Sequence, residues 1–469
     1  RGFEILIGAL ISFYINHKES IISVSQSVSQ SVSMAGFALV LYAIFAFDKN
    51  TPSPSLYTLI PTIGAGLILI FSNNQNIVGK LLGSKLFVGM GLISYSAYLW
   101  HQPLFAFAKL RSINEPSIFI LGLLAVISIL LGYLSWKYVE APFRNKSLIS
   151  RKNIFFYSAL ASVFFILIGL FGHLTKGYEQ RLPKSVIAQS GILKVHKSLR
   201  DDGGCNLHKE DYIPARCIKG NKNTPPNFAL VGDSHASALA HELSTSFLKS
   251  NLSYIQYTKN GCPFAPFIHK KKTENCDKYQ AEYLKDFDSS GIDTFIIGGR
   301  WAFYIDDNDF DNTEGGIELR GLGHDYTANT IPINAPIELR KQSILKAYLD
   351  AVVSLLDKGK TVILIYPIPE QGWDIPAKKA KQIMFNESFN LSIKSEVISK
   401  RNSEIISKFN EIGNRKNLFR VYPIGILCDT YVQGRCVSEL NGESLYYDDD
   451  HLSNEGAKLV VKEVMKFVK

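Results

Sequence analysis

Two short motifs in the second half of the chain contain the residue types that serine catalysis needs. The first (VGDSH, residues 231–235) follows an apolar run and precedes a helical pattern, where an open α/β sheet presents functional groups. The second (DDDHLS, residues 448–453) precedes the last helical pattern. A nucleophilic serine needs an imidazole base and a carboxylate that fixes the tautomer of that base, and His451 and Asp448 can supply both. Together the two motifs indicate a serine-based reaction.

Each motif has a simpler interpretation when it is taken alone. An isolated Gly-Asp-Ser is typical of a helix N-cap, and an acidic run is typical of a solvated loop or a weak Ca²⁺ site. The combination favours catalysis, with Ser234 at a helix N-terminus where its own amide can help to stabilise an oxyanion. We assign no chemical step to His235 and interpret His241, on the following helix, as structural. Nothing in the sequence requires a metal ion.

On these two motifs, residues 225–469 resemble the SGNH hydrolase superfamily. The first block of that family matches the GDSH of the first motif, and its last block, Asp-x-x-His, matches the second. The resemblance implies Ser234 as the nucleophile, His451 as the general base and Asp448 as the orienting carboxylate.

The same resemblance implies further donors in an oxyanion hole. The second block of the family supplies a glycine amide, and Gly261 in NGCP (residues 260–263) is the candidate. The third block usually has Gly-x-Asn after a strand, whereas this chain has GGRW at residues 298–301, with Arg300 at the asparagine position. The oxyanion hole is therefore either incomplete or completed by Arg300.

Apolar runs and helical patterns alternate after residue 227, which predicts a parallel sheet covered on both faces. We expect strands at residues 228–232, 252–258, 294–301, 361–369 and 418–423. We expect helices at about residues 235–249, 342–357, 387–412 and 454–468, and an excursion from the core at residues 303–340. The predicted fold of this half is an α/β three-layer domain, to which the resemblance assigns the SGNH type.

All six cysteines lie after residue 200, in three pairs that are close in sequence. Three local disulfides are the natural prediction, Cys205–Cys217, Cys262–Cys276 and Cys428–Cys436, with free buried thiols as the alternative. Sequence does not fix the connectivity. The CxxC spacing of metal and redox sites is not present. Because disulfides persist in oxidising compartments, we expect this half of the chain outside the cytoplasm.

The chain up to about residue 174 reads as a series of membrane helices. Apolar stretches lie near residues 3–15, 34–47, 56–71, 86–108, 117–139 and 154–174. The last three are long enough to cross a hydrocarbon layer of about 30 Å, and buried helices of a large soluble core are the alternative. The serine repeat at residues 23–33 is expected to form a loop, with a strand as the alternative.

The basic residues of the loops predict how these helices are oriented in the membrane, and the distribution of charge bears on whether the chain binds nucleic acid. The loop between the last two apolar stretches carries four basic residues and one acidic residue, so we place it in the cytoplasm and the chain after Lys176 outside. The formal net charge of +9 forms no basic cluster, so we expect no nucleic-acid partner. A hydrophobic content of 46% excludes a disordered chain.

Three motifs place polar groups beside or within the apolar stretches. They are Arg1 and Glu4 at the start, SYSAYLWHQP at residues 94–103 with His101 in it, and EAPFR at residues 140–144. Ionisable groups at membrane depth are costly and usually face a cavity or pathway. An interfacial aromatic belt with a charge at a helix end is the alternative.

In this order, the three motifs resemble the acyltransferase-3 family of integral membrane acyltransferases, over about residues 1–150. The match covers the later half of the family's helix bundle, so we expect that the chain starts inside a longer protein. The catalytic histidine of the family lies in an early helix outside this match. Arg1, Glu4 and His101 are therefore at most supporting residues.

The two resemblances divide the chain into four parts. They are a partial acyltransferase-3 domain at residues 1–150, an additional membrane helix at 151–175, a linker with a cysteine-bearing extension at 176–227, and an SGNH-like domain at 228–469. One subgroup of the acyltransferase-3 family has this layout and O-acetylates surface polysaccharides such as lipopolysaccharide O-antigen. The fold class is thus a partial all-α transmembrane bundle followed by an α/β domain.

The resemblance implies a multi-pass acyltransferase of the bacterial inner membrane, in contact with membrane lipid, with its C-terminal domain in the periplasm or outside. It implies no bound cofactor, acetyl-CoA as the cytoplasmic acyl donor, and a surface polysaccharide or its lipid-linked precursor as acceptor. The alternatives are a carbohydrate esterase with the same triad, a non-catalytic domain that presents glycan to the membrane half, and a transporter.

Overall fold

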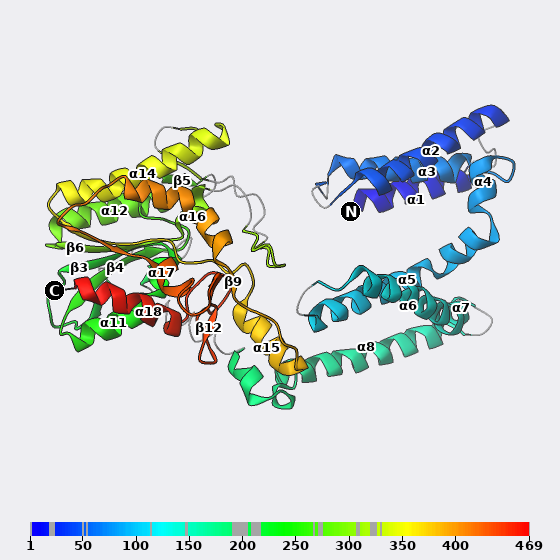
Figure 1. Ribbon diagram of the computed structural model, residues 1–469. Coiled ribbons are helices and arrows are strands. Elements are labelled where there is room, and N and C mark those ends of the chain that lie inside the picture. Colours follow the sequence, from blue (N-terminus) through cyan, green and yellow to red (C-terminus); the bar gives the residue numbers. More distant parts are fainter. Residues whose placement is uncertain are drawn as a thin grey trace. The chain divides into compact units, whose positions relative to one another are not determined.

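The computed structural model divides the chain into two compact units (Figure 1). Unit 1 comprises Arg1–Leu110 and Pro116–Ile166, and unit 2 comprises Arg111–Glu115 and Leu167–Lys469. The structure describes residues 2–17, 24–48, 51–52, 55–112, 115–145, 149–189, 205–207, 217–265, 268–270, 275–305, 310–318, 326–328 and 331–468.

Helices make up most of the described chain up to residue 174. They are α1 (Gly2–His17), α2 (Gln26–Ala46), a 3₁₀ turn (Leu56–Thr58), α3 (Leu59–Phe71), α4 (Ile77–Leu82), α5 (Lys85–Arg111), α6 (Ile118–Ser135), a π turn (Trp136–Glu140), α7 (Ala141–Arg144) and α8 (Arg151–Leu174).

Three of the described helical stretches are long and apolar enough to cross a membrane: Gln26–Ala46, Ile118–Arg144 and Arg151–Leu174. The last two were expected from the sequence. The spanning helix expected at residues 86–108 is not among the three, because serine, histidine and glutamine interrupt the apolar composition of the 27-residue α5.

The serine repeat belongs to α2 from Gln26 onward, so the prediction of a loop there was wrong. Ser29 and Ser33 are buried, and Ser29 Oγ donates a hydrogen bond to the carbonyl of Phe71 at 2.6 Å. Further along, Gly36 and Gly64 leave no room for a Cβ between α2 and α3. Small residues let the two helix backbones approach closely, which explains why a serine-rich stretch is helical here.

Unit 2 is built on a seven-stranded sheet with the order β1-β4-β3-β6-β8-β10, whose neighbours are all parallel. The short β2 pairs antiparallel with β4. The strands are β1 (Asn206–Leu207), β2 (Ile218–Gly220), β3 (Phe228–Gly232), β4 (Ser253–Lys259), β6 (Thr294–Gly298), β8 (Thr361–Ile365) and β10 (Leu418–Val421). The strand order reverses beside β3, and ligands bind at such a switch point in open α/β sheets.

Helices cover both faces of this sheet (Figure 1). One face packs against α12 (Asn275–Ser289), α14 (Ile337–Asp357) and α16 (Ser395–Asn410), and the other packs against α11 (Ala240–Lys249) and α18 (Asn454–Val464). Alternate strand residues enter the two cores, as Val231 and Leu230 do in β3. The predicted fold class, a helical part followed by a three-layer α/β domain, is confirmed.

Several element boundaries differ from those predicted. The strand expected at residues 294–301 ends at Gly298, and Trp301–Ile305 forms α13. The helix expected to begin at residue 387 begins at Ser395. A further helix, α15 (Ile375–Phe385), precedes it, with Asp374 as its N-cap. Of the excursion expected at residues 303–340, the structure describes 303–305, 310–318, 326–328 and 331–340, which include β7 (Tyr326–Ala328) and the start of α14.

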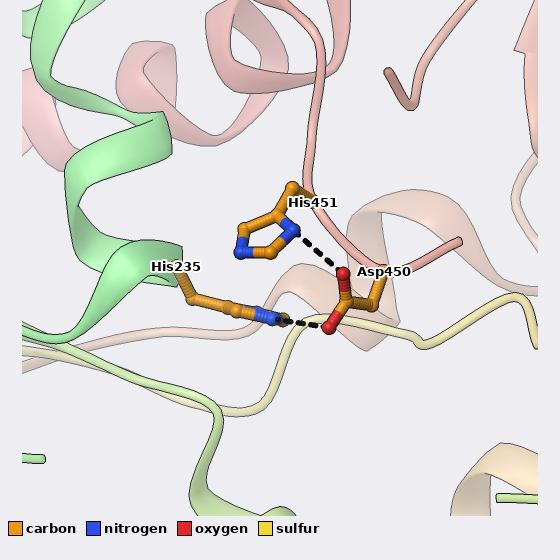
Figure 2. A group of neighbouring side chains, drawn as sticks. All are labelled: His235, Asp450 and His451. Atoms are coloured by element: carbon orange, nitrogen blue, oxygen red, sulfur yellow. Dashed lines mark hydrogen bonds and ion pairs between the residues drawn. The ribbon is translucent and has the colours of Figure 1, made fainter. Parts of the chain in front are cut away.

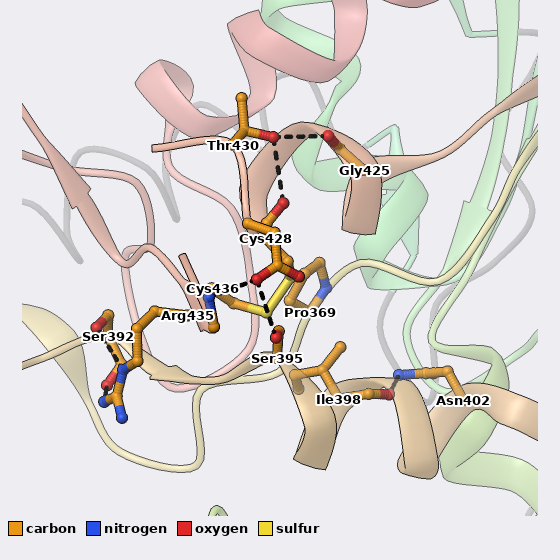
Figure 3. The surroundings of a disulfide bond; sticks show 12 residues. Pro369, Ser392, Ser395, Ile398, Asn402, Gly425, Cys428, Thr430, Arg435 and Cys436 are labelled. Atoms are coloured by element: carbon orange, nitrogen blue, oxygen red, sulfur yellow. Dashed lines mark hydrogen bonds between the residues drawn. A yellow bond between two sulfur atoms is a disulfide. The ribbon is translucent and has the colours of Figure 1, made fainter. Parts of the chain in front are cut away.

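The structure joins the three cysteine pairs that are close in sequence: Cys205–Cys217, Cys262–Cys276 and Cys428–Cys436. The last pair ties the end of α17 (Pro423–Leu427) to β11 (Arg435–Cys436), as Figure 3 shows. Thr430 Oγ1, in the loop after α17, donates to the carbonyl of Gly425 in that helix at 2.8 Å. This disulfide therefore braces the segment that leads into the second motif.

Candidate active site

The loop after β3 presents Ser234 through a sharp turn. Gly232 has φ +148°, and a Cβ at this position would collide with the carbonyl oxygen of Gly298 on β6. The fully buried Asp233 caps the following short helix α10 (Ser234–Ala238), since its Oδ1 accepts the His235 backbone N–H at 2.8 Å. Ser234 is the first residue of α10, at the carboxyl end of the sheet.

The second motif brings a histidine and a carboxylate to this serine. His451 Nε2 lies 2.8 Å from Ser234 Oγ, and His451 Nδ1 lies 2.9 Å from Asp448 Oδ2. Asp448 Oδ1 accepts the backbone N–H of His451 at 2.7 Å, which fixes the carboxylate within the turn. The three residues thus have the mutual geometry of a nucleophile, a base and an orienting group.

Asp450 is a second carboxylate at the same imidazole, and the sequence motifs did not assign it a role. Its Oδ1 lies 2.6 Å from His451 Nδ1, and its Oδ2 lies 3.3 Å from His235 Nε2. Figure 2 shows Asp450 with one oxygen on each imidazole. His235, which received no chemical step from the sequence, is therefore connected to the site through Asp450.

Arg300 lies behind this carboxylate. Its guanidinium contacts Asp450, Glu370 (Nε–Oε1 2.6 Å) and Glu318 (NH1–Oε1 3.2 Å, NH2–Oε2 2.5 Å), and its NH2 also contacts Glu370. All three nitrogens of the guanidinium thus contact carboxylate oxygens. The structure gives the side chain of Arg300 a charge-balancing position and supplies no support for its expected donation to an oxyanion.

The remaining candidate donors are backbone amides. Gly261 follows β4 in the loop at the carboxyl end of the sheet, with φ +67°, and its carbonyl accepts a 3.3 Å hydrogen bond from Tyr326 Oη. Within the described chain, the N–H groups of Gly261 and Ser234 show no hydrogen-bond acceptor. Two amides that follow the neighbouring strands β4 and β3 are thus available for an oxyanion hole.

Charge distribution decides which groups are ionised. Burial acts to raise the pKa of Asp450, but the charges of Arg300 and His451 hold that pKa well below its usual value. Burial acts to lower the pKa of His451, whereas Asp450 and Asp448 outweigh it and raise the pKa above the ordinary imidazole value. The neighbouring Asp449 has a pKa raised to about 6 by burial and by Asp450 and Asp448. The two carboxylates therefore stabilise the imidazolium that forms when His451 accepts a proton.

The side chains of this site also include metal-ligand types. Ligand atoms of His235, Asp450 and His451 lie within 4.8 Å of one another, as do those of Glu318, Asp449 and Asp450. Arg300 already contacts Asp450 and Glu318. This guanidinium therefore competes with a metal ion for oxygen atoms of these two carboxylates.

The structure brings together two of the three motifs of the membrane half. Ser96 Oγ of the SYSAYLWHQP motif donates a hydrogen bond to Glu140 Oε2 of the EAPFR motif at 2.8 Å. Arg144 of the EAPFR motif pairs with Glu140 at 2.7 Å. His101 Nδ1 lies 2.6 Å from the Tyr98 carbonyl on its own helix. Arg1 lies outside the described residues, and Glu4 lies in α1 with its side chain outside them.

Several known proteins are similar to this chain. Peptidoglycan O-acetyltransferase OatA of Listeria monocytogenes is 22% identical over 156 residues, which are 32% of this chain and 25% of the relative. Putative peptidoglycan O-acetyltransferase YrhL of Bacillus subtilis is 24% identical over 155 residues, which are 31% of this chain and 24% of the relative. The chain thus spans about a quarter of the length of these curated relatives.

Among solved structures, the periplasmic domain of a lipopolysaccharide acetyltransferase from Salmonella ser. Paratyphi A aligns with a TM-score of 0.40 and 17% identity. The alignment covers 59% of this chain and 97% of that domain. Residues 201–466 match the family model described as "SGNH domain (fused to AT3 domains)". Because this match covers more than half of the chain, the chain belongs to the family of SGNH domains that are fused to acyltransferase-3 domains.

Proposed function

We propose that this chain belongs to a membrane-bound O-acyltransferase that acetylates hydroxyl groups of a cell-surface polysaccharide, such as lipopolysaccharide O-antigen. The observation that carries the proposal is the Ser234–His451–Asp448 arrangement inside an SGNH domain of the acyltransferase-3-fused family. The curated relatives named as peptidoglycan O-acetyltransferases support the same class of reaction.

In this proposal the membrane half delivers acetyl groups that come from cytoplasmic acetyl-CoA, and the SGNH domain lies outside the cytoplasm. The three helices that can span a membrane and the three disulfides support a chain that crosses the membrane and ends on its oxidising side. The four-part division of the chain and the acyltransferase-3 membership of residues 1–150 are parts of the same proposal.

The chemical steps follow from the geometry around Ser234. His451 Nε2 accepts the proton of Ser234 Oγ while Oγ attacks the acetyl carbonyl, and the amides of Ser234 and Gly261 stabilise the oxyanion. The group that carried the acetyl leaves with the proton from His451, and an acetyl ester remains on Ser234. A sugar hydroxyl then gives its proton to His451 and attacks this ester, which releases the acetylated glycan and restores Ser234.

The test supplies an activated acetyl ester and candidate oligosaccharides to the membrane-embedded chain and to Ser234→Ala. We expect acetylated oligosaccharide that depends on Ser234 and increases at the expense of free acetate. Serine-dependent release of acetate without acetylated product would indicate a carbohydrate esterase instead of a transferase. Equal glycan acetylation by both proteins would indicate that the SGNH domain only presents glycan.

A further inference from the structure

We propose that Asp450 is a second positioning residue for the base His451. It acts together with Arg300 and His235, separately from the contact between Asp448 and His451. This inference rests on the proposed function, because it concerns the same Ser234 reaction. The Asp-x-x-His motif accounts for Asp448 only.

The first argument is the contact of two carboxylates with one nitrogen. Asp450 Oδ1 lies at 2.6 Å from His451 Nδ1, and Asp448 Oδ2 lies at 2.9 Å. The other oxygen of Asp448 accepts the backbone N–H groups of His451 and Asp450, at 2.7 and 3.1 Å. Asp448 therefore shapes the turn as well as facing the imidazole, whereas both oxygens of Asp450 face side chains.

The second argument is burial. The side chain of Asp450 is 3% exposed, whereas that of Asp448 is 22% exposed. Solvent screens a charge near the surface more than one in the interior, so at similar distance the buried carboxylate interacts more strongly with an imidazolium. A lone buried carboxylate would take up a proton, and it needs a compensating cation to stay ionised.

Arg300 provides that compensation. It contacts Asp450 directly and is itself held by Glu318 and Glu370, and Glu370 also pairs with Arg401 at 2.9 Å. Although burial acts to raise the pKa of Glu370, Arg300 and Arg401 hold that pKa below its usual value. Glu370 therefore remains a charged partner of Arg300 when the Asp450 charge is removed. The network therefore allows a substitution at Asp450 that tests the base without dismantling its surroundings.

His235 completes the support from the opposite side. It is 1% exposed, its Nε2 faces Asp450 Oδ2, and within the described chain its Nδ1 has no hydrogen-bond partner. Because a carboxylate oxygen can only accept, His235 Nε2–H acts as a hydrogen-bond donor to Asp450. Asp450 Oδ2 thus contacts both His235 and Arg300, and Asp450 Oδ1 contacts His451.

The titratable side chains that face His451 within the described chain come from two elements. Asp448, Asp450 and Tyr447, whose ring stacks on the imidazole at a centroid distance of 5.3 Å, lie on its own loop. His235 lies on α10, with its ring centroid 4.7 Å from that of His451. Arg300 acts on His451 only through Asp450. Removal of the Asp450 charge should therefore lower the pKa of His451.

The experiment measures how fast a fluorophosphonate probe labels Ser234 in the membrane-embedded chain as a function of pH. Ser234 Oγ forms a bond to phosphorus, fluoride leaves, and His451 takes the serine proton, so neither acyl donor nor glycan is needed. Labelling needs neutral His451 and increases with pH through the pKa of that residue. The variants are Asp450→Asn, Asp448→Asn, the matched control Asp449→Asn and the nucleophile control Ser234→Ala.

For Asp450→Asn we expect the acid limb of the profile to move down by about one pH unit or more, with a plateau rate about tenfold lower. Asp449→Asn should leave the limb within a few tenths of a unit, because Asp449 does not contact His451. An unmoved limb in Asp450→Asn, with or without a lower rate, would overturn the inference and leave Asp450 a purely structural partner of Arg300. Labelling that persists in Ser234→Ala would instead overturn the proposed function.

Discussion

Asp233 Oδ2 accepts the backbone N–H of Arg300 at 2.8 Å, so one buried carboxylate ties the end of β3 to the end of β6. The same oxygen accepts the Tyr304 hydroxyl at 2.7 Å, and Oδ1 caps α10. The residue before the nucleophile therefore positions Ser234 and the backbone of Arg300 together, at the switch point of the sheet.

Asp233→Ala should destabilise unit 2 by about 2 to 4 kcal/mol, because it leaves several buried donors without an acceptor. Tyr304→Phe removes only one of the three partners and should cost about 1 kcal/mol. Denaturant unfolding followed through the buried Trp301 measures both. Equal stability of Asp233→Ala and the unchanged chain would show that Asp233 does not hold this junction.

Asp449→Asn should stabilise the fold at neutral pH. The pKa of Asp449 is raised to about 6 in the folded state, above the usual value of about 4 in the unfolded chain, so the folded state binds more protons between these values. Stability of the unchanged chain therefore decreases as pH increases from about 4 to 6. The asparagine variant avoids this loss, by on the order of 1 kcal/mol above pH 6.

The measurement is the difference in unfolding midpoint between Asp449→Asn and the unchanged chain at several pH values. The advantage of the variant should disappear near pH 4. A difference that stays constant across pH would mean that the Asp449 charge is not what destabilises the fold.

Disulfide content gives a test of the compartment as well as of the fold. All six cysteines are paired in the structure, so a maleimide polymer should add to none of them before reduction and to all after reduction under denaturing conditions. Replacing Cys428 and Cys436 together by serine should cost about 2.5 kcal/mol of stability. Free thiols in the chain isolated from membranes without reduction would contradict the external placement of unit 2.

Close packing of α5 and α6 predicts a difference between two glycines on α6. A Cβ at Gly132 would lie 2.8 Å from the Cα of Ala97, whereas a Cβ at Gly122 would meet nothing within 4 Å. Gly132→Leu should therefore destabilise unit 1 by about 1 to 3 kcal/mol, and Gly122→Leu should have little effect. The survival of monodisperse protein after heating in detergent compares them, and equal survival would contradict the packing of these helices.

The sequence predicted the elements that depend on local pattern and missed those that depend on distant partners. The apolar run at residues 228–232 predicted β3 with its correct bounds, because a central parallel strand is apolar on both faces. The helix in the serine repeat is not predictable from local pattern, because the carbonyl of Phe71 that Ser29 contacts lies 42 residues away. The Asp374 cap and Pro376 near the start of α15 were local signals that could have revealed this helix.

The same distinction applies to the candidate site. The Ser234 and His451 motifs each have a recognisable local pattern, and the structure places their side chains within 2.8 Å. The contacts of Asp450 with Arg300 and His235 join parts of the chain far apart in sequence. Such contacts produce no local sequence pattern. The sequence therefore suggests a role for Arg300 only by comparison with the asparagine in the third block of the SGNH family, and that comparison does not reveal its ion pairs.

The most direct test of the central claim is whether an acetyl group forms an ester with Ser234 during turnover. The membrane-embedded chain is mixed briefly with an activated acetyl ester, quenched in acid and digested, and the peptides are analysed by mass spectrometry. We predict one acetyl group on the peptide that contains Ser234, its loss when an acceptor glycan is added before the quench, and its absence in His451→Ala. Acetylated glycan that forms at the same rate in Ser234→Ala would contradict the account.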